Sequence, residues 1–248
     1  MRLLILGGTA EASTLAGAIA GRPDIDAILS LAGRTQRPAP SPVPTRIGGF
    51  GGVAGLRAYL EAARIGAVVD AAHPFAAQMS RHAAEACAAA KLPLLIFTRP
   101  PWERVDGDRW IDVATMMEAA QALGPVPRNV FLTQGRQQLA AFAAAPHHRY
   151  LVRAIEPPDD IDALPHHRLI LARGPFCLVD EEALMRAQNI EFLVSKNSGG
   201  GATYAKIEAA RNLGLTIVMV RRPDKPDVEQ VIQLETALAW IEAHRAPP

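Results

Sequence analysis

Short runs of hydrophobic residues alternate with longer stretches rich in Ala and Leu along the whole chain. Residues 3–6 form the first such run, the turn Gly7-Gly8-Thr9 follows at once, and residues 10–20 are rich in helix-forming Ala and Leu. Short continuous hydrophobic runs are typical of strands that helices cover on both faces. The pattern therefore predicts an α/β fold in which helices flank mostly parallel sheets.

The same alternation predicts two domains. The strands predicted for the first part of the chain are residues 3–6, 27–31, 45–48, 67–71 and 94–97, with helices that begin near Thr9, Val53 and Ala76. After Arg99-Pro100-Pro101-Trp102 the pattern restarts. The strands predicted there are residues 129–133, 150–155, 168–172, 191–195 and 216–220. We therefore expect one α/β domain at residues 1–98 and a second at residues 99–248.

Composition and charge exclude several classes of function. The formal net charge of the 248 residues is +1, which argues against a broad nucleic-acid-binding surface. Cys87 and Cys177 lie far apart and show no zinc-ligand spacing, so we expect neither a disulfide framework nor a metal site. Gly7, Gly8 and Glu11 interrupt the first apolar run too soon for a signal peptide or a membrane span. We therefore expect a soluble cytoplasmic protein.

The turn after the first predicted strand has two interpretations. Glycines there let the backbone approach a phosphate, and the positive end of the following helix favours an anion. The spacing departs from the G-x-G-x-x-G fingerprint of dinucleotide-binding units, because Thr9 stands at the middle glycine and Ala12 at the third. The Thr9 hydroxyl either donates to a phosphate or caps the helix, and the sequence leaves both roles open.

Arg34 follows the second predicted strand, where NAD-binding units carry an acidic residue for the ribose 2′-hydroxyl. An arginine at this position suits the 2′-phosphate of NADP instead. The alternative is a solvated arginine at the start of a loop. We favour the first interpretation, which predicts NADPH/NADP as the cofactor.

Asp70 and His73 lie at the end of the predicted strand at 67–71. The carboxyl ends of parallel strands are where ligands bind in open α/β sheets, so both residues are candidates for a site. The alternative for each is a turn residue or a helix cap.

The densest group of polar residues comes late in the chain. Ser195-Lys196-Asn197 end a predicted strand, Ser198-Gly199-Gly200-Gly201 form a turn, and Thr203 is placed to cap a helix. Lys196, Lys206 and Arg221 would present positive charges to an anion at this turn. The segment lacks the GK[ST] of a P-loop, and a glycine-rich connection with solvated basic side chains is the alternative. TQGR, at 133–136, repeats the theme more weakly.

The segments LGGTAEA, DAAHPFA, TQGR, SKNSGGGATYAKIEAARNLG and VMVRRP, in this order, resemble the precorrin-6A reductase family of cobalamin biosynthesis over nearly the whole chain. The resemblance implies two Rossmann-like domains, an active site in the cleft between them, and NADPH as the hydride donor. It implies reduction of precorrin-6A, a tetrapyrrole-derived ring with many carboxylates, to precorrin-6B, and hand-over to neighbouring pathway enzymes. A cobalt-containing ring, a non-catalytic NADP- or tetrapyrrole-binding protein and an S-adenosyl-dependent methyltransferase are the alternatives.

The resemblance divides the candidate residues between cofactor and substrate. The predicted cofactor site comprises Gly7, Gly8, Thr9, Gly33, Arg34, Thr35, Gly135, Arg136, Ser198 and Gly199. The predicted substrate site comprises Asp70, His73, Ser195, Lys196, Asn197, Gly200, Thr203, Lys206 and Arg221. Dispersed cations suit a polycarboxylate ring at modest net charge, and Arg136 would add another. The candidate proton donors are His73, Lys196 and Tyr204, with solvent as the alternative.

Overall fold

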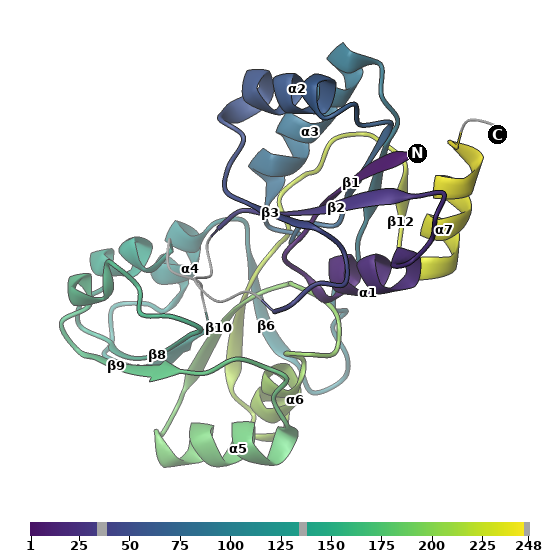
Figure 1. Ribbon diagram of the computed structural model, residues 1–248. Helices are drawn as coiled ribbons and strands as arrows, with labels where there is room; N and C mark the ends of the chain where they lie inside the picture. The colour runs from purple at the N-terminus through teal and green to yellow at the C-terminus, as the bar shows by residue number, and fades with distance from the viewer. Residues whose placement is uncertain (34–38, 134–137, 246–248) are drawn as a thin grey trace. The chain divides into compact units, whose positions relative to one another are not determined.

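The computed structural model describes residues 1–33, 39–133 and 138–245. The chain forms two compact units: unit 1 comprises Met1–Pro100 and Pro223–Pro248, and unit 2 comprises Pro101–Arg222. Each unit contains a six-stranded sheet whose neighbouring strands run parallel, with helices packed against it (Figure 1). The α/β fold expected from the sequence is confirmed.

Unit 1 has the strand order of a Rossmann sheet. Its strands are β1 (Arg2–Leu6), β2 (Asp26–Leu31), β3 (Thr45–Ile47), β4 (Ala67–Asp70), β5 (Leu94–Phe97) and β12 (Gln230–Val231). Its helices are α1 (Ala10–Ile19), α2 (Gly52–Ala62), α3 (Ala77–Ala90) and α7 (Leu234–Ala243). The order is β12-β5-β4-β1-β2-β3, which matches the Rossmann order 3-2-1-4-5-6 with β12 as the sixth strand.

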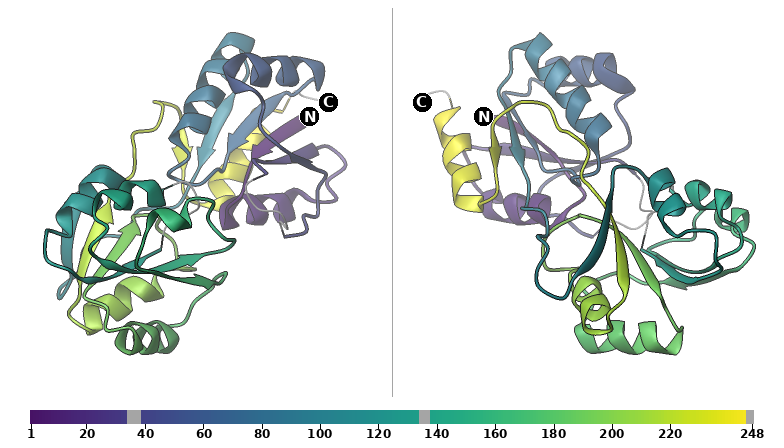
Figure 2. Two further views of the ribbon diagram at one scale, coloured as in Figure 1. Left: turned by 90° about the vertical axis from the view of Figure 1, so that its left-hand side faces the viewer. Right: turned by 180° about the vertical axis from the view of Figure 1, so that it is seen from behind.

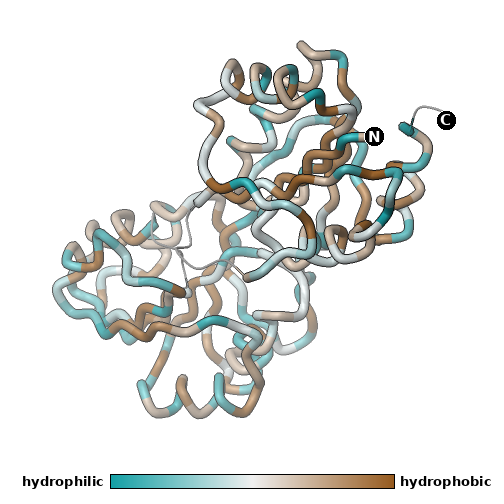
Figure 3. Tube along the Cα trace, viewed as in Figure 1, coloured by the Kyte–Doolittle hydropathy of each residue, from teal (hydrophilic) through white to brown (hydrophobic). Residues whose placement is uncertain are grey.

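Alternate residues of β1 enter two different cores. Leu3 and Ile5 pack with residues of α1 and α7, whereas Leu4 and Leu6 pack with residues of α2 and α3. The helices therefore cover both faces of the sheet, as Figure 2 shows, and Figure 3 shows hydrophobic residues concentrated along the central strands. Burial on both faces explains why this strand has a continuous hydrophobic run instead of an alternating one.

Unit 2 repeats this arrangement with its own elements. Its strands are β6 (Arg109–Val113), β7 (Asn129–Leu132), β8 (Arg149–Ala154), β9 (His167–Leu171), β10 (Phe192–Lys196) and β11 (Thr216–Val220). Its helices are α4 (Met116–Ala122), α5 (Leu178–Ala187) and α6 (Ala205–Asn212), with 3₁₀ turns η1 (Leu139–Ala144) and η2 (Ile161–Ala163). The strand order is β6-β11-β10-β7-β8-β9. Helices α5 and α6 share one core with the sheet, and α4 lies on the opposite face (Figure 1).

The predicted extent of the second domain, residues 99–248, is wrong at its C-terminal end. Strand β12 pairs with β5, and α7 packs against α1, so both belong to unit 1. Conversely, β6 follows β5 along the chain but pairs with β11 in unit 2. The sequence pattern predicts neither strand, because β12 has two residues and β6 is an edge strand in which exposed Asp112 interrupts the hydrophobic run.

Within the described ranges, no helix is both long enough and apolar enough to cross a bilayer. Cys87 and Cys177 are both free thiols.

Candidate functional site

Each sheet has one point at which its strand order reverses, and ligands bind in open α/β sheets outside the carboxyl ends of the strands at such points. In unit 1 this point lies between β1 and β4, where Leu6 is in register with Asp70. In unit 2 it lies between β7 and β10, where Leu132 is in register with Val194. The fold thus brings the sequence-predicted turns after β1 and β4 together in unit 1, and it places the ends of β7 and β10 side by side in unit 2.

The two glycines after β1 have different roles. A Cβ atom at Gly7 would lie 2.5 Å from Leu29 Cδ1 and 3.2 Å from Ala12 Cβ, so Gly7 is needed for close packing of the turn. Gly8 has φ +109, and a Cβ atom there would meet no described atom within 4 Å. Gly7 is therefore structural, whereas Gly8 leaves open space beside the first turn of α1. Such a cradle fits the phosphates of a dinucleotide.

The Thr9 side chain caps α1. Its Oγ1 accepts a hydrogen bond from the backbone N–H of Ala12 at 3.2 Å and donates one to the Ala71 carbonyl oxygen at 2.7 Å. The single hydroxyl proton is thus committed to Ala71, at the end of β4. Of the two interpretations of Thr9, the structure selects the cap, and any phosphate contact of this residue would come from its backbone N–H.

Gly33 lies just after β2 and has φ +74, a conformation that favours glycine. Four other predicted cofactor residues, Arg34, Thr35, Gly135 and Arg136, lie outside the described residues.

Asp70 is fully buried, which contradicts its predicted contact with a substrate. Its Oδ1 accepts a hydrogen bond from the N–H of Ala72 at 3.0 Å, and its Oδ2 accepts one from the Ser80 hydroxyl at 2.5 Å. His73 is half-buried, and its Nδ1 accepts a hydrogen bond from the N–H of Phe75 at 3.2 Å. Asp70 therefore shapes the turn that presents His73.

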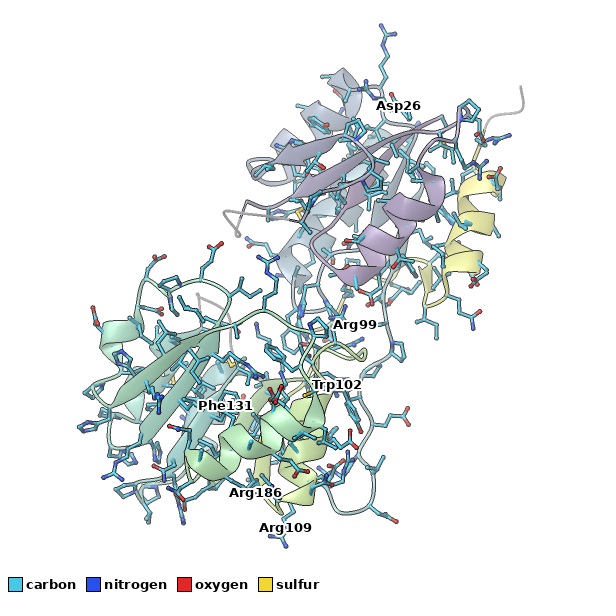
Figure 4. The ribbon with its side chains drawn as sticks, turned by 60° about the horizontal axis from the view of Figure 1, so that its bottom comes forward. Asp26, Arg99, Trp102, Arg109, Phe131 and Arg186 are labelled. Carbon is cyan, nitrogen blue, oxygen red and sulfur yellow. The ribbon has the colours of Figure 1, made fainter. Side chains whose placement is uncertain are left out.

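Trp102 organises the turn after β10. The Asn197 side chain accepts a hydrogen bond from the Trp102 N–H at 2.7 Å and donates one to the Trp102 carbonyl at 2.8 Å. The Trp102 indole N–H in turn donates to the Gly200 carbonyl at 2.8 Å. Trp102 is labelled in Figure 4. The Asn197 amide thus holds the chain, and a direct substrate contact by this side chain does not fit. Gly199 and Gly200 need to be glycine, because their φ angles are +70 and +73.

An arginine that sequence reasoning did not select also holds this turn. The guanidinium of Arg222 donates to the carbonyl oxygens of Asn197 and Ser198, each at 2.9 Å. Its predicted neighbour Arg221 is exposed. Ser195 is fully buried and its hydroxyl donates to the Lys196 carbonyl, so its side chain does not fit a direct ligand contact. Lys196 is half-buried at the end of β10.

Lys206 is a buried ammonium at the start of α6. It is 5% exposed, its Nζ donates to Thr133 Oγ1 at 3.0 Å, and Nζ lies 5.6 Å from the centre of the Trp102 ring. Burial, and then the positive charge of Arg153, lower the pKa of Lys206 to about 7. Arg153 itself forms a buried ion pair with Glu181. Lys206 thus lies against Thr133, just after β7. Its burial does not fit the predicted direct contact with the substrate.

Lys206 gives a pH dependence of stability. Between its folded-state pKa of about 7 and its ordinary value of 10.5, the unfolded chain binds a proton that the folded chain does not. The free energy of unfolding therefore rises with pH through this window, by up to about 1.4 kcal/mol per pH unit. In urea denaturation at pH 7 and pH 9, the wild type should gain stability relative to Lys206→Met. Parallel pH dependences of the two proteins would show that Lys206 keeps an ordinary pKa.

The expected helix cap at the entry to α6 is wrong. The helix begins at Ala205 with Tyr204 at the N-cap, and no side chain caps it, so Thr203 is a turn residue. The Tyr204 hydroxyl accepts a hydrogen bond from Arg211 at 2.8 Å, and Arg211 pairs with Asp108, just before the amino end of β6. The hydroxyl keeps its own proton in this contact, so Tyr204 as a proton donor stays a prediction.

The fold and its switch points define an α/β protein of the Rossmann-like class. Residues 2–242 match the family described as “Precorrin-6x reductase CbiJ/CobK”. The precorrin-6A reductase of Rhodobacter capsulatus is 46% identical over 247 residues, which cover 100% of this chain and 98% of the relative. That of Rhodococcus erythropolis is 47% identical over 241 residues, 97% of each chain. A solved structure named “CobK precorrin-6A reductase” has a TM-score of 0.93 at 46% identity and covers 100% of this chain and 98% of its own. The chain belongs to the precorrin-6x reductase CbiJ/CobK family.

Proposed function

We propose that this protein is a precorrin-6A reductase, which uses NADPH to reduce one double bond of the precorrin-6A ring and so forms precorrin-6B. The observation that carries the proposal is the full-length similarity to a precorrin-6A reductase, at 46% identity, with the same fold at a TM-score of 0.93. The ring without cobalt is the proposed substrate, since both curated relatives described above are named for it.

The residues at the switch point of unit 1 fit a dinucleotide. The open space at Gly8 and the first-turn N–H groups of α1 would hold the phosphates. Gly33 leads the chain from β2 to Arg34, which we assign to the ribose 2′-phosphate. When bound, NADPH supplies the hydride; the protein binds and orients the reactants.

The substrate side of the proposal rests on unit 2. A polycarboxylate ring needs fixed cations, and Lys196 is half-buried at the carboxyl end of β10, beside a turn held by Trp102 and Arg222. Arg221 and Arg136 would add charge. We assign contacts with the carboxylates of the substrate to Lys196. Lys206 is buried near the carboxyl ends of the same strands.

Reduction of a double bond also requires a proton, and the contacts of the candidate residues guide our choice of its donor. The Tyr204 hydroxyl accepts a hydrogen bond from Arg211, which pairs with Asp108 just before β6. His73 Nδ1 accepts a hydrogen bond from the Phe75 N–H, so an imidazolium at this position would lose that bond. Lys196 is therefore the proton donor that we favour, with solvent as its rival.

Binding and turnover separate this function from its alternatives. NADPH, NADH and S-adenosylmethionine should be titrated into the protein, followed by precorrin-6A and its cobalt form, with absorbance read at the nicotinamide band. We expect tight NADPH binding and loss of absorbance on addition of precorrin-6A. Binding of NADPH without turnover of either ring would indicate a sensor or carrier, and S-adenosylmethionine binding would indicate a methyltransferase.

Arg34 provides a test of cofactor choice. Arg34→Ala should weaken NADPH binding by about 1.5 to 3 kcal/mol, the contribution of charged hydrogen bonds, while NADH affinity changes little. Isothermal titration with both cofactors measures the difference. Equal losses for NADPH and NADH would remove Arg34 from the 2′-phosphate site.

We place the reaction in the cytoplasm, since Cys87 and Cys177 are both free and suit a reducing compartment. Hand-over of the reduced ring to neighbouring enzymes of the pathway is part of the same proposal.

A further inference from the structure

Unit 1 contains a buried ammonium that the proposed function does not use. Lys225 lies in the segment between β11 and β12, and its side chain is 11% exposed. Its Nζ is buried, and no acceptor in the described part of the chain is within hydrogen-bonding distance. Asp70 Oδ2, 3.7 Å away, carries the opposite charge. A buried ammonium is costly, and a buried ion pair is weak evidence for added stability, so the position calls for another reason.

Asp70 connects Lys225 to the turn after β1. The Asp70 carboxylate accepts hydrogen bonds from the Ala72 N–H and the Ser80 hydroxyl, which fixes the chain just after β4. The next link is the Ala71 carbonyl, which accepts the Thr9 hydroxyl proton. Thr9 then caps α1 through the Ala12 N–H. A continuous series of polar contacts thus runs from Lys225 to the first turn of α1.

We propose that Lys225 is a positioning residue for the dinucleotide turn. Its positive charge holds the Asp70 carboxylate in place, Asp70 sets the backbone at Ala71 and Ala72, and the Ala71 carbonyl orients Thr9 beside Gly8. Lys225 touches no ligand; it acts through Asp70. The proposal rests on the proposed function only in assigning the turn to NADPH, because the series of contacts exists without a ligand.

The surroundings of Lys225 favour this role over a ligand site of its own. Lys225 lines a cavity of about 290 Å³ together with Arg81, Ala84, Glu85, Asp224 and Pro226. Positive and negative side chains are balanced there, so the cavity offers an anion no net attraction. The carboxylate that pairs with Lys225 is the buried Asp70, which leads back to β4 and the turn.

Lys225→Met tests the proposal, because it removes the charge and keeps most of the side-chain volume. Arg81→Met is the matched control: it removes a cation from the same cavity, and Arg81 is not among the described hydrogen-bond or ion-pair partners of Asp70. Lys225→Arg is the conservative variant. We expect Lys225→Met to raise the Kd for NADPH about tenfold, Lys225→Arg to restore most of the affinity, and Arg81→Met to leave it unchanged.

A second measurement needs no ligand. Amide hydrogen exchange, followed by NMR in the free protein, should be faster at Ala72 and Ala12 in Lys225→Met than in the wild type or Arg81→Met. If Lys225→Met does not fold, Ser80→Ala, which removes one hydrogen bond to Asp70, should show the same changes at smaller size. Wild-type affinity and wild-type exchange at both amides in a folded variant would overturn the proposal. If the wild type binds no NADPH, the assignment of the turn fails, while the exchange data still decide the role of Lys225.

Discussion

Gly8→Ala is expected to weaken NADPH binding about thirtyfold. The methyl group would enter the open space beside the first turn of α1, where we place the phosphates, and forcing a methyl group into a close contact costs about 1 to 3 kcal/mol. Because Gly8 has φ +109, alanine there also strains the backbone, by about 1 to 3 kcal/mol. A fluorescence titration with NADPH measures the affinity, and thermal unfolding measures the strain.

The strain requires a matched control, and Gly21 provides one. It follows the C-cap of α1, has φ +76, and a Cβ atom there would also meet no described atom within 4 Å. Gly21→Ala should therefore lose stability much as Gly8→Ala does, but it should keep wild-type NADPH affinity, since it lies at the other end of the helix. Similar NADPH affinities for the two variants would mean that the turn after β1 does not hold the cofactor.

Arg153→Met is expected to destabilise the folded protein by about 3 to 5 kcal/mol, because it leaves a buried carboxylate unpaired. Arg153 and Glu181 form an ion pair whose side chains are 6% and 2% exposed. The guanidinium also lies 3.7 Å from the centre of the Phe176 ring. Urea denaturation measures the loss of unfolding free energy.

The double variant Arg153→Met, Glu181→Leu separates the charge from the packing. Once both charges are gone, no buried carboxylate needs compensation, so most of the lost stability should return. If the double variant is as unstable as Arg153→Met, the loss comes from packing against Phe176 and not from the unpaired Glu181.

Local sequence signals predicted most strands and the turns that follow β1, β4 and β10. Strands covered on both faces read as hydrophobic runs, and Gly8, Gly199 and Gly200 mark places where the backbone needs positive φ. Two edge strands, β6 and β12, were not predicted. Strand β6 exposes part of its surface and β12 is very short, so neither has a hydrophobic run that reveals its sheet.

The roles of individual site residues were harder to predict, because they depend on partners that are distant in sequence. The candidates Asp70 and Asn197 lie at the predicted strand ends, yet both hold backbone: Asp70 through Ala72, and Asn197 through Trp102. In the sequence, Trp102 and the prolines before it indicated only a domain boundary. An aromatic residue beside two prolines, and Arg222 beside Arg221, were the available signals, but neither reveals which turn it contacts.

Burial changed the interpretation of the lysines in the same way. Lys206 and Lys196 look alike in the sequence. Lys206, however, is 5% exposed and lies against the Trp102 ring, whereas Lys196 is half-buried at the end of β10. The low pKa of Lys206 follows from that burial and from Arg153, on a different strand. No local pattern contains this information.

Transfer of deuterium tests the central claim most directly. NADPH carrying two deuterium atoms at the reactive carbon of the nicotinamide should be supplied with precorrin-6A and the protein, and the mass of the ring should be followed. We expect one deuterium in the reduced ring for each NADPH oxidised, with the second hydrogen taken from solvent. Oxidation of NADPH without deuterium in the ring, or an unreduced ring, would contradict the account.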